Sequence, residues 1–231
     1  GKSRPLDGHD GLTVSEISFT PDGSRVVTGG YNGTVCVWDV SSSDTFDRIA
    51  QDGADPRSSV PAFAPMDVDR IPLASGSLSR VERFQLSSGF DGLFAAIVGD
   101  ATGKKSEVRI ANYEKPKQLA ITILRGHAFC NELEFAGAGF ESTVACALDD
   151  GGVVTVKLTE AGAKVSQLFR HSRAGSSVSC CRWSPIFASG DVDGSLRSWD
   201  FRAPEGSGPI FECQPAGSDF NCCSFSPCEK F

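Results

Sequence analysis

The side chains best suited to nucleophilic, acid–base or metal chemistry are nine cysteines and three histidines in a chain of 231 residues. The densest cysteine group is Cys213, Cys222, Cys223 and Cys228, which has no C-x-x-C pair and no nearby histidine, so it lacks the spacing of a zinc site. Adjacent residues on a strand point to opposite faces, so the pair Cys180–Cys181 is not placed to chelate one ion. We therefore expect no bound metal and predict that the cysteines are small buried residues of a reducing compartment.

Three other motifs have the residue types of a catalytic or cofactor site but not the required pattern. Asp149-Asp150 is followed by Gly151-Gly152, which indicates a tight turn rather than an acid pair. The segment 99–106 resembles a phosphate loop but has too few residues between its glycines and a lysine where Ser or Thr belongs. Gly137-Ala138-Gly139 lacks the third glycine of a dinucleotide site. The sequence thus predicts no catalytic residue, no cofactor and no enzyme activity.

An internal repeat organises the chain. Residues 8–40 contain three short apolar runs separated by turn residues at 21–23 and 31–33, and residues 170–201 repeat the same order. A third copy, 126–158, places His127 44 residues before His171 and Asp150 43 residues before Asp193. A period in the low forties, with Gly-His near the start and Trp-Asp at the end, is typical of a four-stranded propeller blade.

These motifs resemble the WD40-repeat family, with residues 8–39 and 170–200 as the closest copies. The resemblance implies an all-β fold, a β-propeller of four-stranded blades around a central channel, and a function in binding proteins rather than in catalysis. We therefore expect an incomplete arc of about four blades plus part of a fifth. The chain has no initiator methionine and ends at Phe231 inside an expected strand, so we expect a piece of a longer protein with exposed strand edges.

The repeat boundaries follow from this period within a single domain, 1–231. We predict repeats at about 1–42, 71–116, 119–158 and 164–203, a partial repeat at 209–231, and an insertion loop at 43–70. The alternative is an extra blade at 44–87, in which residues 73–77 form the second strand. The insertion is rich in aspartate, which indicates either a solvated acidic loop or a segment that docks on a partner.

The resemblance also implies a hydrogen-bonded relay inside each blade, because a buried imidazole and a buried indole N–H both need partners. In each relay a turn histidine meets a hydroxyl of the second strand, a tryptophan of the third and an acidic or amide side chain of the intervening turn. The fourth-repeat set is His171, Ser189, Asp193 and Trp199, and the first-repeat set is His9, Thr28, Asn32 and Trp38. The third copy keeps His127 and Asp150 but has Cys146 and Val156 in place of the hydroxyl and the indole. All three histidines are thus expected to be structural, which leaves no spare imidazole as a base.

One surface motif suggests a particular partner. Trp199, Asp200 and Arg202 resemble the WDxR box through which some WD40 proteins dock on the adaptor of cullin-RING ubiquitin ligases. Ser198 stands where that box usually has an aliphatic residue, and many blades end this way without binding the adaptor. Arg202 is therefore expected to be either an adaptor contact or a solvated side chain.

The composition of the chain excludes some kinds of binding partner. The net charge is −7, so we expect no binding to nucleic acid, and the apolar runs are far shorter than the ~20 residues of a membrane span. We predict a cytoplasmic or nuclear scaffold or adaptor that binds proteins or peptides within a multiprotein complex. The alternatives are a substrate receptor of a cullin-RING ligase and an architectural subunit of a coat, pore or ribosome-assembly complex.

Overall fold

The computed structural model describes the four blades but not residues 41–67, which make up most of the predicted insertion, or the two ends of the chain. The described residues are 8–40, 68–89, 92–118, 120–125, 128–137, 139–159, 162–171, 175–180, 184–204, 206–214 and 222–226. All regular structure within these ranges is β-strand, which confirms the predicted all-β class. None of the described residues forms a helix with the length and hydrophobicity needed to cross a membrane.

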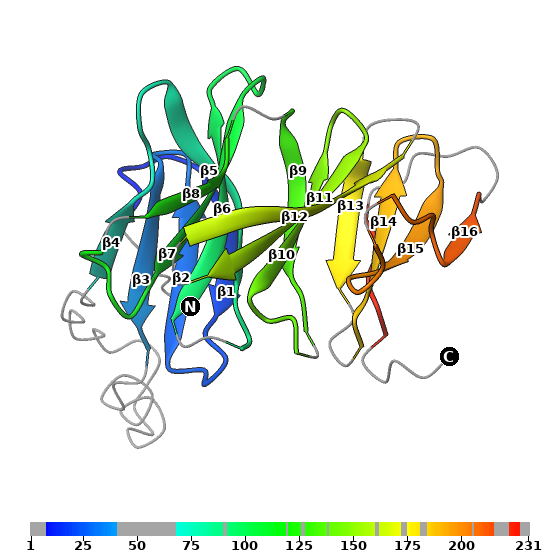
Figure 1. Ribbon diagram of the computed structural model, residues 1–231. Helices are drawn as coiled ribbons and strands as arrows, with labels where there is room; N and C mark the ends of the chain where they lie inside the picture. The colour runs from blue at the N-terminus through cyan, green and yellow to red at the C-terminus, as the bar shows by residue number, and fades with distance from the viewer. Residues whose placement is uncertain are drawn as a thin grey trace, which may run out of the picture.

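Four antiparallel sheets of four strands follow one another along the chain, and we call them blades 1 to 4 (Figure 1). Blade 1 consists of β1 (Val14–Phe19), β2 (Arg25–Gly30), β3 (Thr34–Asp39) and β4 (Val68–Pro72), and blade 2 of β5 (Leu78–Leu86), β6 (Leu93–Asp100), β7 (Ser106–Asn112) and β8 (Ile121–Leu124). Blade 3 consists of β9 (Cys130–Phe135), β10 (Thr143–Leu148), β11 (Gly152–Thr159) and β12 (Gly162–Arg170), and blade 4 of β13 (Gly175–Cys180), β14 (Ile186–Asp191), β15 (Leu196–Asp200) and β16 (Phe211–Cys213). In each blade the first strand is the inner strand.

Glycines in the left-handed region close the hairpins between these strands. Gly33 and Gly194 lie between the second and third strands of blades 1 and 4, with φ of 73° and 81°. A side chain at such a φ is sterically disfavoured, so Gly after Asn or Asp fixes the turn and with it the register of the blade. The Asn-Gly and Asp-Gly signals in the sequence therefore mark the turns correctly.

The blades stack face to face, so the second and third strands are covered on both faces. All six residues of β10 are buried, which explains why this strand is a continuous apolar run rather than an alternating one. Three core clusters of the described residues join neighbouring blades: Val27 and Val81 belong to one, Ala95 and Leu133 to another, and Ala145 and Val178 to the third. The result is an incomplete propeller whose blades fan out as an arc (Figure 1).

The blade boundaries differ from the predicted repeats by one strand. The outer strands β8, β12 and β16 lie within or at the start of the predicted repeats 119–158, 164–203 and 209–231, yet each pairs with the third strand of the preceding blade. A sequence repeat thus supplies the outer strand of one blade and three strands of the next. Within the predicted partial repeat, residues 211–213 complete blade 4 instead of beginning a fifth.

The predicted insertion also ends too late. Residues 68–70 belong to β4, which pairs with β3, whereas residues 43–67 lie outside the described residues. The alternative of an extra blade at 44–87 placed its second strand at residues 73–77. This placement is wrong, because residues 73–77 form no strand and Ser75 makes only an isolated bridge with Leu78. The strands β5, β6 and β7 are the inner, second and third strands of blade 2, and all three lie within the predicted repeat 71–116.

Candidate functional site

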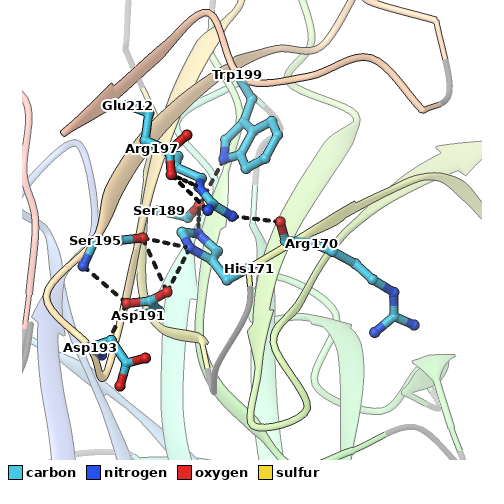
Figure 2. Close-up of polar contacts among 9 residues, drawn as sticks. All are labelled: Arg170, His171, Ser189, Asp191, Asp193, Ser195, Arg197, Trp199 and Glu212. Atoms are coloured by element: carbon cyan, nitrogen blue, oxygen red, sulfur yellow. Dashed lines mark hydrogen bonds and ion pairs between the residues drawn. The ribbon is translucent and has the colours of Figure 1, made fainter. Parts of the chain in front are cut away.

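A buried chain of hydrogen bonds crosses blade 4 from its third strand to the turn before β13 (Figure 2). The Trp199 indole Nε1–H donates to Ser189 Oγ at 2.7 Å, and Ser189 Oγ lies 2.6 Å from His171 Nε2. The other imidazole nitrogen, Nδ1, lies 3.2 Å from Asp191 Oδ2 and 3.3 Å from Ser195 Oγ. We call this chain of four groups (Trp199, Ser189, His171 and Asp191) the blade 4 relay.

The two ends of the relay determine the protonation of its centre. An indole can only donate and a carboxylate can only accept. The Ser189 hydroxyl therefore accepts from Trp199 and donates to His171 Nε2, and the imidazole is neutral with its proton on Nδ1, facing Asp191. Burial lowers the pKa of His171, and the nearby Arg197 cation lowers this pKa further, although Asp191 opposes the shift. A neutral imidazole at pH 7 is consistent with this direction of hydrogen bonding.

The acidic partner of His171 is Asp191 and not the predicted Asp193. Asp191 is the last residue of β14, and its Oδ1 accepts hydrogen bonds from the amides of Asp193 and Ser195, both at 3.0 Å. These bonds hold the Asp191 carboxylate inside the turn beneath His171, while the Asp193 side chain is exposed (Figure 2). Burial opposes the charged form, but the Ser195 amide and hydroxyl keep the pKa of Asp191 below its usual value.

Blade 1 contains a relay with a different terminal group. The Trp38 indole donates to Thr28 Oγ1 at 2.9 Å, Thr28 Oγ1 lies 2.7 Å from His9 Nε2, and His9 Nδ1 lies 3.1 Å from Asn32 Oδ1. The predicted set is thus brought together here. Gly30 stands where blade 4 has Asp191, at the end of the second strand, and a side chain there would clash with the His9 ring. The glycine explains why the next polar residue of the turn, Asn32, serves as the partner.

Blade 3 has no such chain of polar groups among its described residues. Cys146 and Val156 occupy the positions of the hydroxyl and the indole and are fully buried in an apolar cluster. Asp150 lies exposed in the turn, where its carboxylate accepts from the Gly152 amide at 2.8 Å. His127 lies outside the described residues.

The WDxR-like motif is split between the core and the surface. Trp199 and Phe201 are buried, whereas the Arg202 side chain is 65% exposed. Arg202 forms a two-pronged ion pair with Asp200, with Nη2 at 2.6 Å from Oδ2 and Nε at 3.0 Å from Oδ1. The guanidinium is therefore presented to solvent in a fixed orientation.

The remaining chemical motifs are turns or thiols, and the expectation that the cysteines are buried holds for Cys36, Cys130, Cys146 and Cys180 but not for Cys222, which is exposed. In the segment resembling a phosphate loop, Asp100 Oδ1 accepts from the amides of Lys104 and Lys105, so its own carboxylate occupies the place a phosphate would need. Burial raises the pKa of the Cys130 thiol, and it raises the pKa of Cys223 to about 11. No disulfide joins the described cysteines, and the described residues contain no group of three potential metal ligands.

Two open hollows lie along the inner strands. One, of about 470 Å³, is lined by Tyr31, Glu82, Arg83 and Asn131 together with neighbouring residues of β1, β5 and β9. The other, of about 400 Å³, lies between Pro21, Gln85, Glu134 and neighbouring residues. Sequence reasoning missed both, because their walls come from different blades.

The comparison with protein families agrees with this architecture. The family model "WD domain, G-beta repeat" matches residues 2–39 and 162–200, which contain the inner three strands of blades 1 and 4. These two segments are WD40 repeats. Both matched segments end at a Trp-Asp pair, and the second begins with β12, the outer strand of the preceding blade. WD40 repeats are generally protein-interaction scaffolds, and propellers of this kind are typically non-enzymatic. No curated protein matches the chain.

Proposed function

We propose that this WD40 protein is a scaffold or adaptor that holds other proteins in a multiprotein complex, with no catalytic activity of its own. The observation that carries the proposal is the separation of its polar groups into two sets. The indole, hydroxyl and imidazole groups of the relays in blades 1 and 4 are buried and bonded to one another, whereas the 470 Å³ hollow presents accessible polar side chains from three blades. Binding at the hollow would leave the relays, and hence the fold, undisturbed.

The composition of the hollow indicates the kind of contact it makes. Glu82 and Arg83, which carry opposite charges, both line the hollow, and Arg83 also pairs with Glu132 at 3.8 Å on the neighbouring blade. The Arg80 guanidinium lies 4.9 Å above the Tyr31 ring. Mixed charge beside an aromatic ring is typical of protein recognition surfaces. The thiols without disulfides support a cytoplasmic or nuclear location.

The test is affinity purification of the natural protein from its own cells with a paired substitution, Glu82→Ala with Arg83→Ala. The matched control is Lys115→Ala with Lys117→Ala, which removes two charges from the loop between β7 and β8. We expect the first pair to reduce at least one stoichiometric partner tenfold and the control to retain it. An unchanged partner set, or no stoichiometric partner for the unmodified protein, contradicts the proposal.

The exposed Arg202 favours a second candidate, a substrate receptor of a cullin-RING ligase. The Asp200 carboxylate orients the guanidinium at the end of β15, which is the arrangement an adaptor contact would need. Co-purification with the cullin adaptor should fall at least tenfold in Arg202→Ala. Lys115→Ala serves as the control for loss of an exposed cation. Equal recovery of the adaptor with Arg202→Ala, or no adaptor with the unmodified protein, refutes this role.

A further inference from the structure

The outer strand of blade 3 is longer than the outer strands of the other three blades. β12 has nine residues, whereas β4, β8 and β16 have five, four and three. Each of these strands stands at the end of its sheet, so one of its edges has no strand partner among the described residues. A long open edge is a template on which a further strand can form, and proteins usually keep such edges short. β12 therefore presents the longest outer edge of the described blades.

The backbone of β12 directs hydrogen-bonding groups toward this open edge. The His171 amide donates to the Gly151 carbonyl at 2.8 Å, so the chain at His171 faces β11. Bonding directions alternate along an antiparallel strand, and Leu168 lies three residues earlier, so its N–H and C=O point away from β11. These two groups face solvent and are available to an added strand.

Val165 has the same orientation on the other side of a bulge in the pairing of β11 with β12. The Leu158 amide donates to the Ser142 carbonyl of β10 at 2.6 Å, so Leu158 faces β10. Its neighbour Lys157 therefore faces β12, and the partner of Lys157, which is Lys164, faces back toward β11. The N–H and C=O of Val165, the next residue of β12, consequently point to the open edge.

One face of β12 is apolar and exposed. Val165 and Leu168 lie opposite Val156 and Val154, which belong to the core cluster shared with blade 2. The exposed fractions of Val165 and Leu168 are 42% and 37%. β8, the outer strand of blade 2, lies beside β12 (Figure 1), and its Ile121 is 52% exposed. An apolar strip thus faces solvent along the rim between blades 2 and 3.

The opposite face of β12 is cationic. Lys164 lies directly across from Lys157 of β11, and both side chains are exposed. Like charges opposite each other on neighbouring strands destabilise a sheet. Neither lysine forms an ion pair with an acidic side chain in the part of the chain that the structure describes. An anionic group placed beside the two ammonium groups would remove this repulsion.

We propose that the open edge of β12 binds, as an added strand, an extended segment of another protein in which acidic and apolar residues alternate. The side chains of a strand point alternately to its two faces. The acidic residues of the added strand therefore lie beside Lys157 and Lys164, and its apolar residues lie beside Val165 and Leu168. Main-chain hydrogen bonds provide affinity, and the alternating side chains provide specificity. This surface is separate from the hollow and from Arg202.

A second copy of the chain does not fit this edge. β12 contains Lys164 and Arg170 and has no acidic residue, so pairing of two β12 strands would bring cations of both copies together. Charged side chains on an edge strand are a usual means of preventing such self-association. The same charges admit a strand that carries acidic residues, because specificity depends on repulsion of the wrong partner as well as on attraction of the right one.

The test measures the binding of fluorescein-labelled peptides to the full chain by fluorescence anisotropy. The probe alternates valine and glutamate, the control peptide alternates valine and lysine, and we expect only the first to bind. Lys157→Glu with Lys164→Glu should weaken binding of the probe roughly tenfold or more. Lys104→Glu with Lys105→Glu, which reverses two exposed lysines between β6 and β7, should leave it unchanged. No binding of the probe, or equal loss in both variants, overturns the proposal.

Backbone pairing has a second test, which requires no variant of the protein to fold. The probe is N-methylated either at every valine or at every glutamate. In a strand paired along one edge, the N–H groups of one residue type point to β12 and those of the other type point away. One methylated peptide should therefore keep its affinity, and the other should lose it. Equal binding of the two contradicts strand addition at β12, whatever the hollow binds.

Discussion

Ser189→Ala removes the group on which the blade 4 relay depends. The hydroxyl is fully buried, accepts from the Trp199 indole at 2.7 Å and lies 2.6 Å from His171 Nε2. Alanine leaves both ring nitrogens buried without their partner. Each unmet buried group costs about 1–3 kcal/mol, so for two groups we expect the free energy of unfolding to fall by about 2–6 kcal/mol. That is a large fraction of the total of about 5–15 kcal/mol for a typical domain.

The chain itself provides the control, because blade 1 has threonine at the equivalent position. Thr28 Oγ1 makes the same two contacts, with Trp38 and His9, at 2.9 and 2.7 Å. Ser189→Thr should therefore keep both bonds and change stability by less than about 1 kcal/mol, the extra methyl being the only cost. Comparing the two variants therefore separates the effect of losing the hydroxyl from the effect of changing the size of the side chain.

The assay combines urea unfolding with a local readout, because a stack of repeats can unfold in stages rather than all at once. Near-ultraviolet circular dichroism follows the whole chain. The indole N–H resonance of Trp199 and the amide exchange of β14 and β15 follow blade 4 alone. The reasoning is refuted if Ser189→Ala unfolds within about 0.5 kcal/mol of the unmodified protein and the Trp199 indole exchanges no faster.

Three further predictions concern the same framework. Asp191→Ala should lower the free energy of unfolding by about 2 kcal/mol and Asp193→Ala by less than about 1 kcal/mol in urea titrations, because Asp191 is the buried carboxylate; equal losses would mean that His171 has no specific acidic partner. The pKa of His171 is lower in the folded state than its ordinary value of 6.5. The neutral imidazole should therefore contribute fully to the free energy of unfolding above pH 6.5, and this contribution should decline as the pH falls through the lower folded-state pKa. An NMR titration of the imidazole protons with an ordinary midpoint would contradict this. Glu134→Gln should leave the contact between blades 3 and 4 as stable as in the unmodified protein at pH 7, because burial raises the pKa of the Glu134 carboxyl and an amide oxygen can still accept from the Cys180 amide. Glu134→Ala removes the acceptor and should lower the free energy of unfolding by about 1–2 kcal/mol in thermal unfolding. If both variants melt at similar temperatures, the bond contributes nothing to stability.

The strands and turns could be predicted from sequence because their signals are local. Asn32-Gly33 and Asp193-Gly194 each mark a hairpin, and the apolar runs between such turns have strand length. The outer strands could not be assigned in the same way. In β16 the residues Phe211–Cys213 are only three and mostly exposed, so their place in blade 4 depends on pairing with β15 rather than on any pattern of their own.

The relay was predictable except for its acid. His171, Ser189 and Trp199 follow from the repeat, but the choice between two aspartates depends on backbone direction. Ser189 and Asp191 are two residues apart on one strand, so their side chains share a face, and this alternation was the signal that could have identified Asp191. The contacts between blades, such as the Cys180 amide with Glu134, join residues 46 positions apart in the sequence, so no local pattern reveals them.

Comparison of the two relays shows which of their hydrogen bonds the fold requires. The indole and the hydroxyl have the same geometry in blades 1 and 4, whereas the group beyond the imidazole is an amide, Asn32, in one and a carboxylate, Asp191, in the other. In blade 1, Gly30 leaves room for the His9 ring, so Asn32 serves as the partner of the imidazole. In blade 4, the turn around Asp191 holds its carboxylate against His171. Because a neutral imidazole needs only one acceptor for its Nδ1 proton, either group suffices. The fold therefore requires that a buried indole N–H donate to a hydroxyl. Blade 3 has valine in place of the indole and cysteine in place of the hydroxyl, so it needs no such hydrogen bond.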